Sequence, residues 1–273
     1  MCIRDSSHHL VYPRGNEVVA VDAATGEVAW RVERNGVVLG LAANAAHAFV
    51  VGGGRVAALD PESGAVQWET QLVEDVFTQG PIQVDASAKD VIVSIGTGIQ
   101  ALDADTGAMH WTLKFGTSDI QMIRGTPATV YVIVASGTVT ALDANTGATQ
   151  WEQKGMFSRN QQMISGLDDD TIYLSSTDEI GALSRADGSK RWSFNSVDDL
   201  KQPEAIDRSV FEDGHLIARG QGMVWDIDPK TGVVKAGKRV TTATPGRVRG
   251  RQLYLLQATF GGAASWRLLS LGL

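Results

Sequence analysis

The chain has 273 residues and a formal net charge of −7. This acidic balance argues against a nucleic-acid-binding protein, which would carry a basic surface. No apolar run is long enough to span a membrane as a helix, and the only cysteine is Cys2, so the fold cannot depend on an internal disulfide bond.

The first nine residues do not read as part of the fold. Residues 1–9 have neither the apolar core of a signal peptide nor a strand pattern, and we expect a non-native or disordered start. After them, 10–12 and 18–21 read as the second and third strands of a unit and 28–32 as the fourth. The first strand of this unit is therefore predicted to be missing.

A short phrase then returns along the chain: an apolar run, Asp, a turn with Gly, and Trp at a spacing of roughly 40 residues, which is the period of a propeller blade. Four copies are complete: Asp22, Gly26 and Trp30; Asp60, Gly64 and Trp68; Asp103, Gly107 and Trp111; Asp143, Gly147 and Trp151. A fifth copy has Ser184 in place of Asp before Gly188 and Trp192, and a sixth keeps Asp228 and Gly232 but has Ala236 in place of Trp.

The second unit shows what each period contains. Four short apolar runs, 37–41, 47–51, 55–59 and 65–72, predict four strands, with glycines 52–54 in a hairpin turn between the second and third. Third strands are predicted to end at Val21, Leu59, Leu102, Leu142, Leu183, Ile227 and Leu271.

These patterns predict an all-β protein, a β-propeller of four-stranded antiparallel blades with about seven blades in this chain. The last unit supplies three strands, 247–249, 252–257 and 266–271, and the chain stops before a fourth. A blade left open would expose an unpaired edge, so we expect an N-terminal segment to complete it. We expect a single domain over 10–273, truncated at its N-terminus, and eight blades in an intact protein if an upstream stretch is lost.

The recurring residues have a structural interpretation first. The Asp side chain can accept backbone N–H groups ahead of it, and the Gly can adopt the left-handed conformation that closes the turn. A Trp on each outer strand can fill the wedge between neighbouring blades with its N–H on a backbone carbonyl. We therefore expect the five Trp residues to dock blades and the Asp and Gly residues to form turns.

Two charged segments depart from the repeat. Six cations lie close together late in the chain, and they form either a solvated face or a docking patch for an acidic partner: Lys235, Lys238, Arg239, Arg247, Arg249 and Arg251. We take Arg247, Arg249 and Arg251 as candidate partner-binding residues, together with the long connection 198–208. The acidic run 168–170 reads as an exposed turn rather than a Ca²⁺ site, because the ligands of Ca²⁺ must be spaced to converge.

No pattern indicates catalysis. The five His residues have no metal-ligand spacing, the glycine pairs lie in hairpins rather than before a helix, and no nucleophile elbow is present. We therefore predict no catalytic, cofactor-binding or metal-binding residues, no cofactor, and a protein that is not an enzyme.

The phrase Ala-Leu-Asp-x-x-Thr-Gly-x-x-x-Trp, which residues 141–151 match, resembles the pyrroloquinoline-quinone-type propeller repeat. The end on a third strand narrows the resemblance to the BamB-like outer-membrane assembly lipoproteins. This resemblance implies an interaction scaffold that assists assembly of outer-membrane β-barrel proteins and docks to their insertase. It implies the periplasmic face of the outer membrane or another extracytoplasmic site, with the membrane reached only through a lost N-terminal anchor. The alternatives are a fragment of a quinone-dependent dehydrogenase, whose usual adjacent cysteine pair Cys2 cannot supply, and a sensor or cell-surface propeller module.

Overall fold

The computed structural model describes the backbone of residues 3–4, 9–73, 80–116, 118–157, 163–195, 206–220, 222–239, 243–249, 252–259 and 265–272, and the side chains of these residues except 3–4, 207–208 and those from 243 onward. Every regular element in these ranges is a β-strand. Within the same ranges, no helix is long and apolar enough to cross a membrane.

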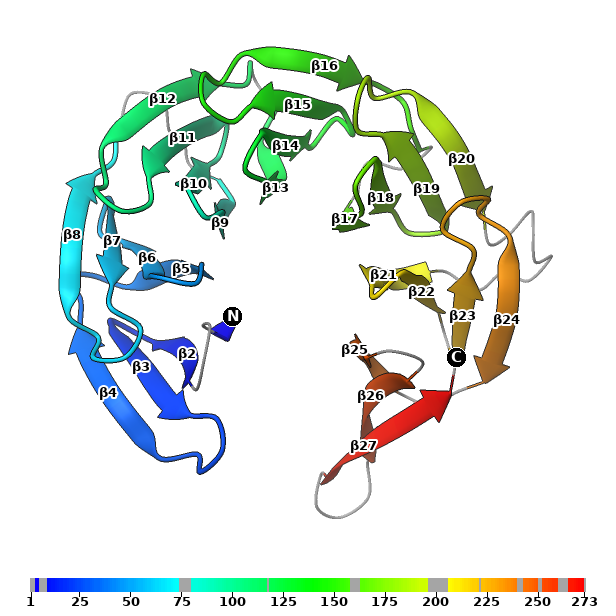
Figure 1. The fold of residues 1–273 in the computed structure, drawn as a ribbon, viewed down its shortest axis with the longest axis horizontal. Helices are drawn as coiled ribbons and strands as arrows, with labels where there is room; N and C mark the ends of the chain where they lie inside the picture. The colour runs from blue at the N-terminus through cyan, green and yellow to red at the C-terminus, as the bar shows by residue number, and fades with distance from the viewer. Residues whose placement is uncertain are drawn as a thin grey trace. The chain divides into compact units, whose positions relative to one another are not determined.

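The chain divides into two compact units, Met1–Glu152 and Gln153–Leu273. The first unit holds four sheets, each of four antiparallel strands taken in chain order (Figure 1). Their strands are β1 Ile3–Arg4, β2 His9–Arg14, β3 Glu17–Asp22 and β4 Val28–Glu33; β5 Val38–Ala43, β6 Ala48–Gly52, β7 Arg55–Leu59 and β8 Val66–Gln71; β9 Ile82–Ala86, β10 Asp90–Ile95, β11 Gly98–Asp103 and β12 Met109–Lys114; β13 Ile120–Gly125, β14 Thr129–Val134, β15 Val139–Asp143 and β16 Thr149–Gln153.

The second unit holds two further four-stranded sheets and one sheet of three strands (Figure 1). These are β17 Met163–Leu167, β18 Thr171–Ser175, β19 Glu179–Ser184 and β20 Lys190–Asn195; β21 Ile206–Glu212, β22 His215–Gly220, β23 Met223–Ile227 and β24 Val234–Arg239; β25 Ala243–Arg249, β26 Gln252–Thr259 and β27 Ser265–Gly272.

The prediction of an all-β propeller with about seven antiparallel blades is confirmed, and each predicted third strand ends within one residue of its expected position. One expectation is wrong. Ile3–Arg4 forms a short strand paired with β2 through Ile3 and Val11, and His9 is the first residue of β2. The first blade therefore has a first strand. This strand was missed because two residues are too few to form an apolar pattern. The single domain and the eight-bladed intact protein stay predictions.

Burial follows the position of a strand within its sheet. The middle strands lie between the neighbouring sheets, so β10 and β14 are buried along almost their whole length. The fourth strands are more exposed, and in β12 the buried Trp111 lies between the exposed His110 and Thr112. Apolar clusters fill the spaces between adjacent sheets. One of them joins Phe49 of β6 to Val91 of β10.

A β-bulge recurs between third and fourth strands, immediately after the turn that joins them. In the second blade it falls between Ala58 and Leu59 and places Ala58 directly opposite Trp68. The same pairing joins Ala20 to Trp30, Ala101 to Trp111 and Ala182 to Trp192. A small residue opposite the indole leaves the ring free to lean toward the next blade, which explains the Ala of the repeated phrase.

Candidate functional site

The turn between the third and fourth strands is built by its Asp side chain. Asp103 Oδ1 accepts the N–H of Thr106 at 2.8 Å and its hydroxyl at 2.7 Å, and the N–H of Gly107 donates to the carbonyl of Asp103 at 2.9 Å. Hydrogen bonds from the Thr106 side chain and from the backbone lower the pKa of Asp103. Asp22, Asp60, Asp143 and Asp228 accept the N–H groups two and three residues ahead in the same way.

The fifth blade reaches the same turn by another route. Ser184 has no carboxylate, and Asp187 accepts both the N–H of Ser189 at 3.0 Å and its hydroxyl at 2.7 Å. The N–H of Gly188 still donates to the carbonyl of Ser184 at 2.9 Å. The carboxylate has moved along the turn without changing this backbone hydrogen bond.

Each tryptophan that follows a turn reaches the turn of the next blade. Trp111 Nε1–H donates to the carbonyl of Ala144 at 2.7 Å, where Ala144 follows Asp143. The matching bonds run from Trp30 to Pro61, from Trp68 to Ala104 and from Trp192 to Pro229, at 2.9 to 3.0 Å. Trp151, near the end of the first unit, lies 5.9 Å from the ring of Tyr131.

The turn glycine forms the floor on which the indole lies. A Cβ added at Gly147 would come within 2.8 Å of Trp111 Cδ2 and Cε3, so a side chain there would displace the ring. Gly64, Gly107 and Gly232 lie equally close to Trp30, Trp68 and Trp192. The Asp, Gly and Trp of the repeat therefore form one device that joins successive blades.

A second turn lies at the same end of each blade and was missed in the sequence. Between first and second strands, Asn44 Oδ1 accepts the N–H of His47 at 2.8 Å and Ser87 Oγ accepts that of Asp90 at 3.0 Å. Thr126 and Asp168 hold the matching turns of later blades. The only signal is a short polar residue three or four positions before the second strand, and its type changes from blade to blade.

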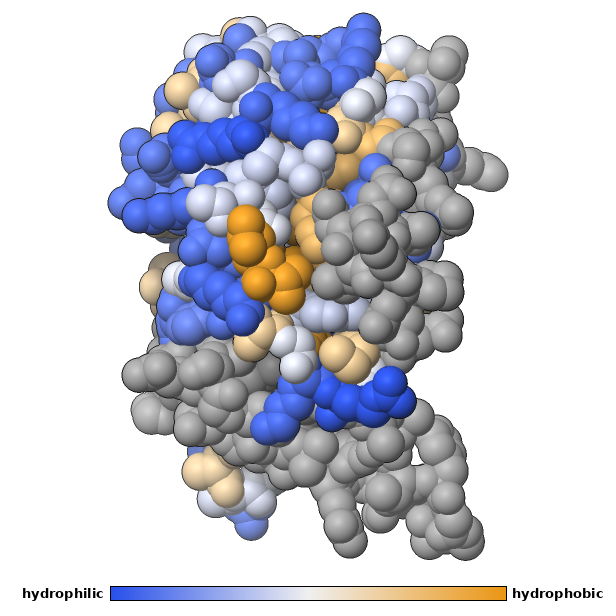
Figure 2. All heavy atoms as spheres, turned by 90° about the vertical axis from the view of Figure 1, so that its right-hand side faces the viewer, coloured by the Kyte–Doolittle hydropathy of each residue, from blue (hydrophilic) through white to orange (hydrophobic). Residues whose placement is uncertain are grey.

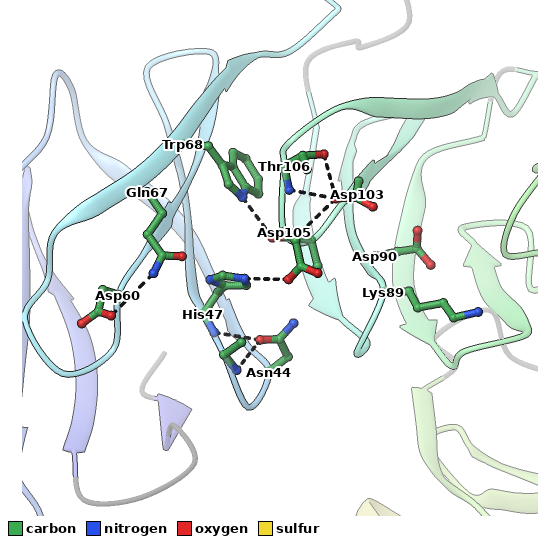
Figure 3. Close-up of polar contacts among 12 residues, drawn as sticks. Asn44, His47, Asp60, Gln67, Trp68, Lys89, Asp90, Asp103, Asp105 and Thr106 are labelled. Atoms are coloured by element: carbon green, nitrogen blue, oxygen red, sulfur yellow. Dashed lines mark hydrogen bonds and ion pairs between the residues drawn. The ribbon is translucent and has the colours of Figure 1, made fainter.

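Between the second and third blades, these two sets of turns meet in a polar surface that we call the turn face, formed by 44–47, 60–63, 87–90 and 103–106 (Figure 3). His47 Nε2 lies 3.0 Å from Asp105 Oδ1 on the next blade, and Asn44 Nδ2 donates to the carbonyl of Ser87 at 3.0 Å. The His47 side chain is only 9 % exposed, while that of Asp105 is 76 % exposed. The turn face thus presents carboxylates to solvent from a backbone that is hydrogen-bonded across blades.

His110, on the fourth strand β12, contacts two carboxylates of the turn face. Its Nδ1 lies 2.8 Å from Asp90 Oδ1 and its Nε2 lies 3.6 Å from Asp103 Oδ2. Burial raises the pKa of Asp90, and the hydrogen bond from His110 opposes that effect. These groups position one another. Among the described residues no group of three or more His, Cys, Asp or Glu side chains could hold a metal ion.

The acidic run 168–170 is tied into the fifth blade. The Asp168 carboxylate accepts the Tyr173 hydroxyl at 2.6 Å and the N–H of Thr171 at 2.7 Å, and Arg191 lies 3.6 Å from Asp170. Burial and the bond to Asp168 raise the pKa of Tyr173. The Asp168 oxygens are occupied by these donors, as expected of a turn.

The candidate partner-binding residues lie mostly beyond what the structure describes. Arg247 and Arg249 belong to β25, with their side chains outside the described atoms, and Arg251 lies outside the described residues. In the connection 198–208, only 206–208 are described, as the start of β21.

Comparisons with known proteins agree with this fold. A family model described as outer membrane protein assembly factor BamB matches residues 14–169 and 135–258. The crystal structure of BamB from Moraxella catarrhalis superposes with a TM-score of 0.66 and 24 % identity, covering 92 % of this chain and 79 % of that one. The C-terminal WD40 domain of Sif2 superposes with a TM-score of 0.67 and 12 % identity, covering 91 % and 75 % of the two chains. No curated protein matches by sequence.

Proposed function

We propose that this chain, which belongs to the family of the outer membrane protein assembly factor BamB, is a non-enzymatic interaction scaffold that assists the assembly of outer-membrane β-barrel proteins. Its partner in this role is the β-barrel insertase. Its place is extracytoplasmic, on the periplasmic face of the outer membrane.

The observation that carries the proposal is the match of the family model across 14–169 and 135–258, in which the blade-joining device recurs. The indole N–H groups of four tryptophans are used to bind the next blade: Trp30, Trp68, Trp111 and Trp192. The turns are held in one conformation by hydrogen bonds and project side chains toward solvent. Such turns suit protein recognition, because preorganised loops lose little entropy on binding.

The turn face supports a role without bond-making chemistry. Both ring nitrogens of His110 face carboxylates, Nδ1 that of Asp90 and Nε2 that of Asp103, so His110 has no ring nitrogen free to accept a proton from a neighbouring hydroxyl or thiol.

The test is genetic and quantitative. The gene is deleted in its own host, and the amounts of folded β-barrel proteins in isolated outer membranes are measured by heat-modifiable electrophoretic mobility. The proposal expects these amounts to fall and to recover when the gene is restored. Unchanged amounts of every β-barrel protein would contradict it.

A further inference from the structure

The fourth strand of the sixth blade, β24, differs from the other fourth strands. Ala236 stands where those strands carry Trp, and β24 contains three cations, Lys235, Lys238 and Arg239. By contrast, β8 carries Glu69, which pairs with Arg34 and Arg55, and β12 carries His110, which pairs with Asp90 and Asp103.

The loss of Trp leaves this strand uncovered. Trp111 and Trp151 are 8 % exposed, whereas Ala236 and the two residues after it are exposed, and Lys238 is exposed at a position where Phe194 of β20 is buried. A chain that binds alongside β24 would therefore find backbone and small side chains rather than a ring.

The backbone of β24 is also available. It is the last strand of its sheet and pairs only with β23 among the described strands. An edge strand of this kind can accept an added strand from a partner through main-chain hydrogen bonds. Gly237, in the middle of the strand, has no side chain, and it packs closely against Trp225, because a Cβ added there would lie 3.1 Å from Trp225 Cδ1.

The charge of the surface selects the partner. Lys235 lies 3.3 Å from Asp228, but in the described part of the chain neither Lys238 nor Arg239 has an ion-pair partner. Both are exposed on a protein of net charge −7. Unpaired cations beside a free edge favour an acidic segment, which they would attract and orient.

An exposed apolar residue lies just before the same strand. Val233 is 63 % exposed. On the side that carries β24, Figure 2 shows a small apolar patch with strongly hydrophilic side chains along one side of it. An incoming strand that carries an apolar side chain among its acidic ones would cover part of this surface.

We propose that the outer edge of β24 docks an extended acidic segment of a partner protein as an added fifth strand, with Lys238 and Arg239 paired to its carboxylates. This inference rests on the proposed function and names the chemistry of one partner surface.

The test uses the full chain and a fluorescein-labelled twelve-residue peptide that repeats Glu-Glu-Val-Thr, so that Glu lies on both faces of the added strand, opposite both Lys238 and Arg239, and binding is read by fluorescence anisotropy. We expect saturable binding that weakens with added salt and falls about tenfold in K238E/R239E, because two charge pairs are replaced by repulsion. The matched control is K114E/K190E, which makes the same charge change on β12 and β20, and it should bind as the wild type does. An equal loss in both variants, or equal binding of a Lys-for-Glu peptide, would overturn the proposal.

A second probe tests strand addition. The same acidic peptide with N-methyl groups on alternate amides keeps its charge and loses the donors of one edge. Two such peptides, one for each edge, are compared, and we expect one of them to bind at least about tenfold more weakly, since several main-chain hydrogen bonds are lost. Unchanged affinity for both would overturn the added strand.

Failure here is separable from failure of the proposed function. A chain that restores β-barrel proteins in the deletion host but does not bind the acidic peptide contradicts this inference alone. A chain that binds the peptide through Lys238 and Arg239 but restores nothing contradicts the proposed function alone.

Discussion

Substitution of the turn glycine under a tryptophan tests how the blades are joined. In Gly147→Ala, the backbone must keep a φ of 71° with a Cβ present, which costs about 1–2 kcal/mol. The same Cβ would lie 2.8 Å from Trp111 Cδ2 and Cε3, and displacement of a packed ring adds about 1–3 kcal/mol. We therefore expect a loss of about 2–5 kcal/mol in the free energy of unfolding.

The first blade provides a matched control. Gly26 occupies the same turn position with a φ of 75°, and a Cβ there would meet no atom within 4 Å. Gly26→Ala should cost only the backbone part, about 1–2 kcal/mol. Urea unfolding, followed by both tryptophan fluorescence and circular dichroism so that two-state behaviour is checked, gives both values.

A double-mutant cycle isolates the contact itself. In a Trp111→Leu background the ring is absent, so the added cost of Gly147→Ala should fall to that of Gly26→Ala. Equal costs for Gly26→Ala and Gly147→Ala in the wild-type background would refute the proposed contact between the indole and the next turn.

Three further predictions follow from the hydrogen bonds and the pKa shifts. Trp111→Phe leaves the Ala144 carbonyl without its 2.7 Å donor and should cost about 1–3 kcal/mol in urea unfolding; an unchanged midpoint would count against the bond. The folded pKa of Asp103 lies below its ordinary value of 3.8, so its ionised form stabilises the protein above about pH 4 and this contribution is lost as the pH falls through the folded pKa. Asp103→Asn should therefore be less stable than wild type at pH 7, and this difference should shrink as the pH falls through the folded pKa of Asp103; a difference in midpoint that stays constant as the solution is made acidic would contradict the assignment. Burial raises the pKa of Asp85, whose Oδ2 accepts the N–H of Gly125 at 2.7 Å, so ionisation of Asp85 opposes folding above its ordinary pKa. Asp85→Asn, whose amide oxygen can still accept that bond, should gain stability over wild type as the pH rises from about 4 to 7. A gain that shrinks over this range would show that the pKa of Asp85 is lowered rather than raised.

The fold was predictable because each blade repeats the same short sequence pattern. An apolar run, Asp, Gly and Trp return at nearly constant spacing, and each of these residue types has one conformational reason for its place. Ala20 or Ala58 opposite a Trp follows the same rule, although the pairing becomes visible only with the register.

The contacts of the turn face were not predictable from one sequence. His47 and Asp105 lie 58 residues apart in the chain, and no local pattern states that their blades are neighbours at that point. The turn between first and second strands is held by four different residue types, namely Asn44, Ser87, Thr126 and Asp168. Its recurrence therefore cannot be recognised from the sequence. Ile3–Arg4 was missed because a pair of residues has no periodicity.

The most direct measurement of the central proposal is affinity capture. The chain, tagged and expressed in its own host, is purified from detergent-solubilised envelopes, and its partners are identified by mass spectrometry against an equally expressed unrelated periplasmic protein. Specific recovery of the β-barrel insertase is the predicted result. Recovery of the chain without any outer-membrane assembly component, while the folded protein is shown intact by its circular dichroism, would contradict the proposed scaffold role.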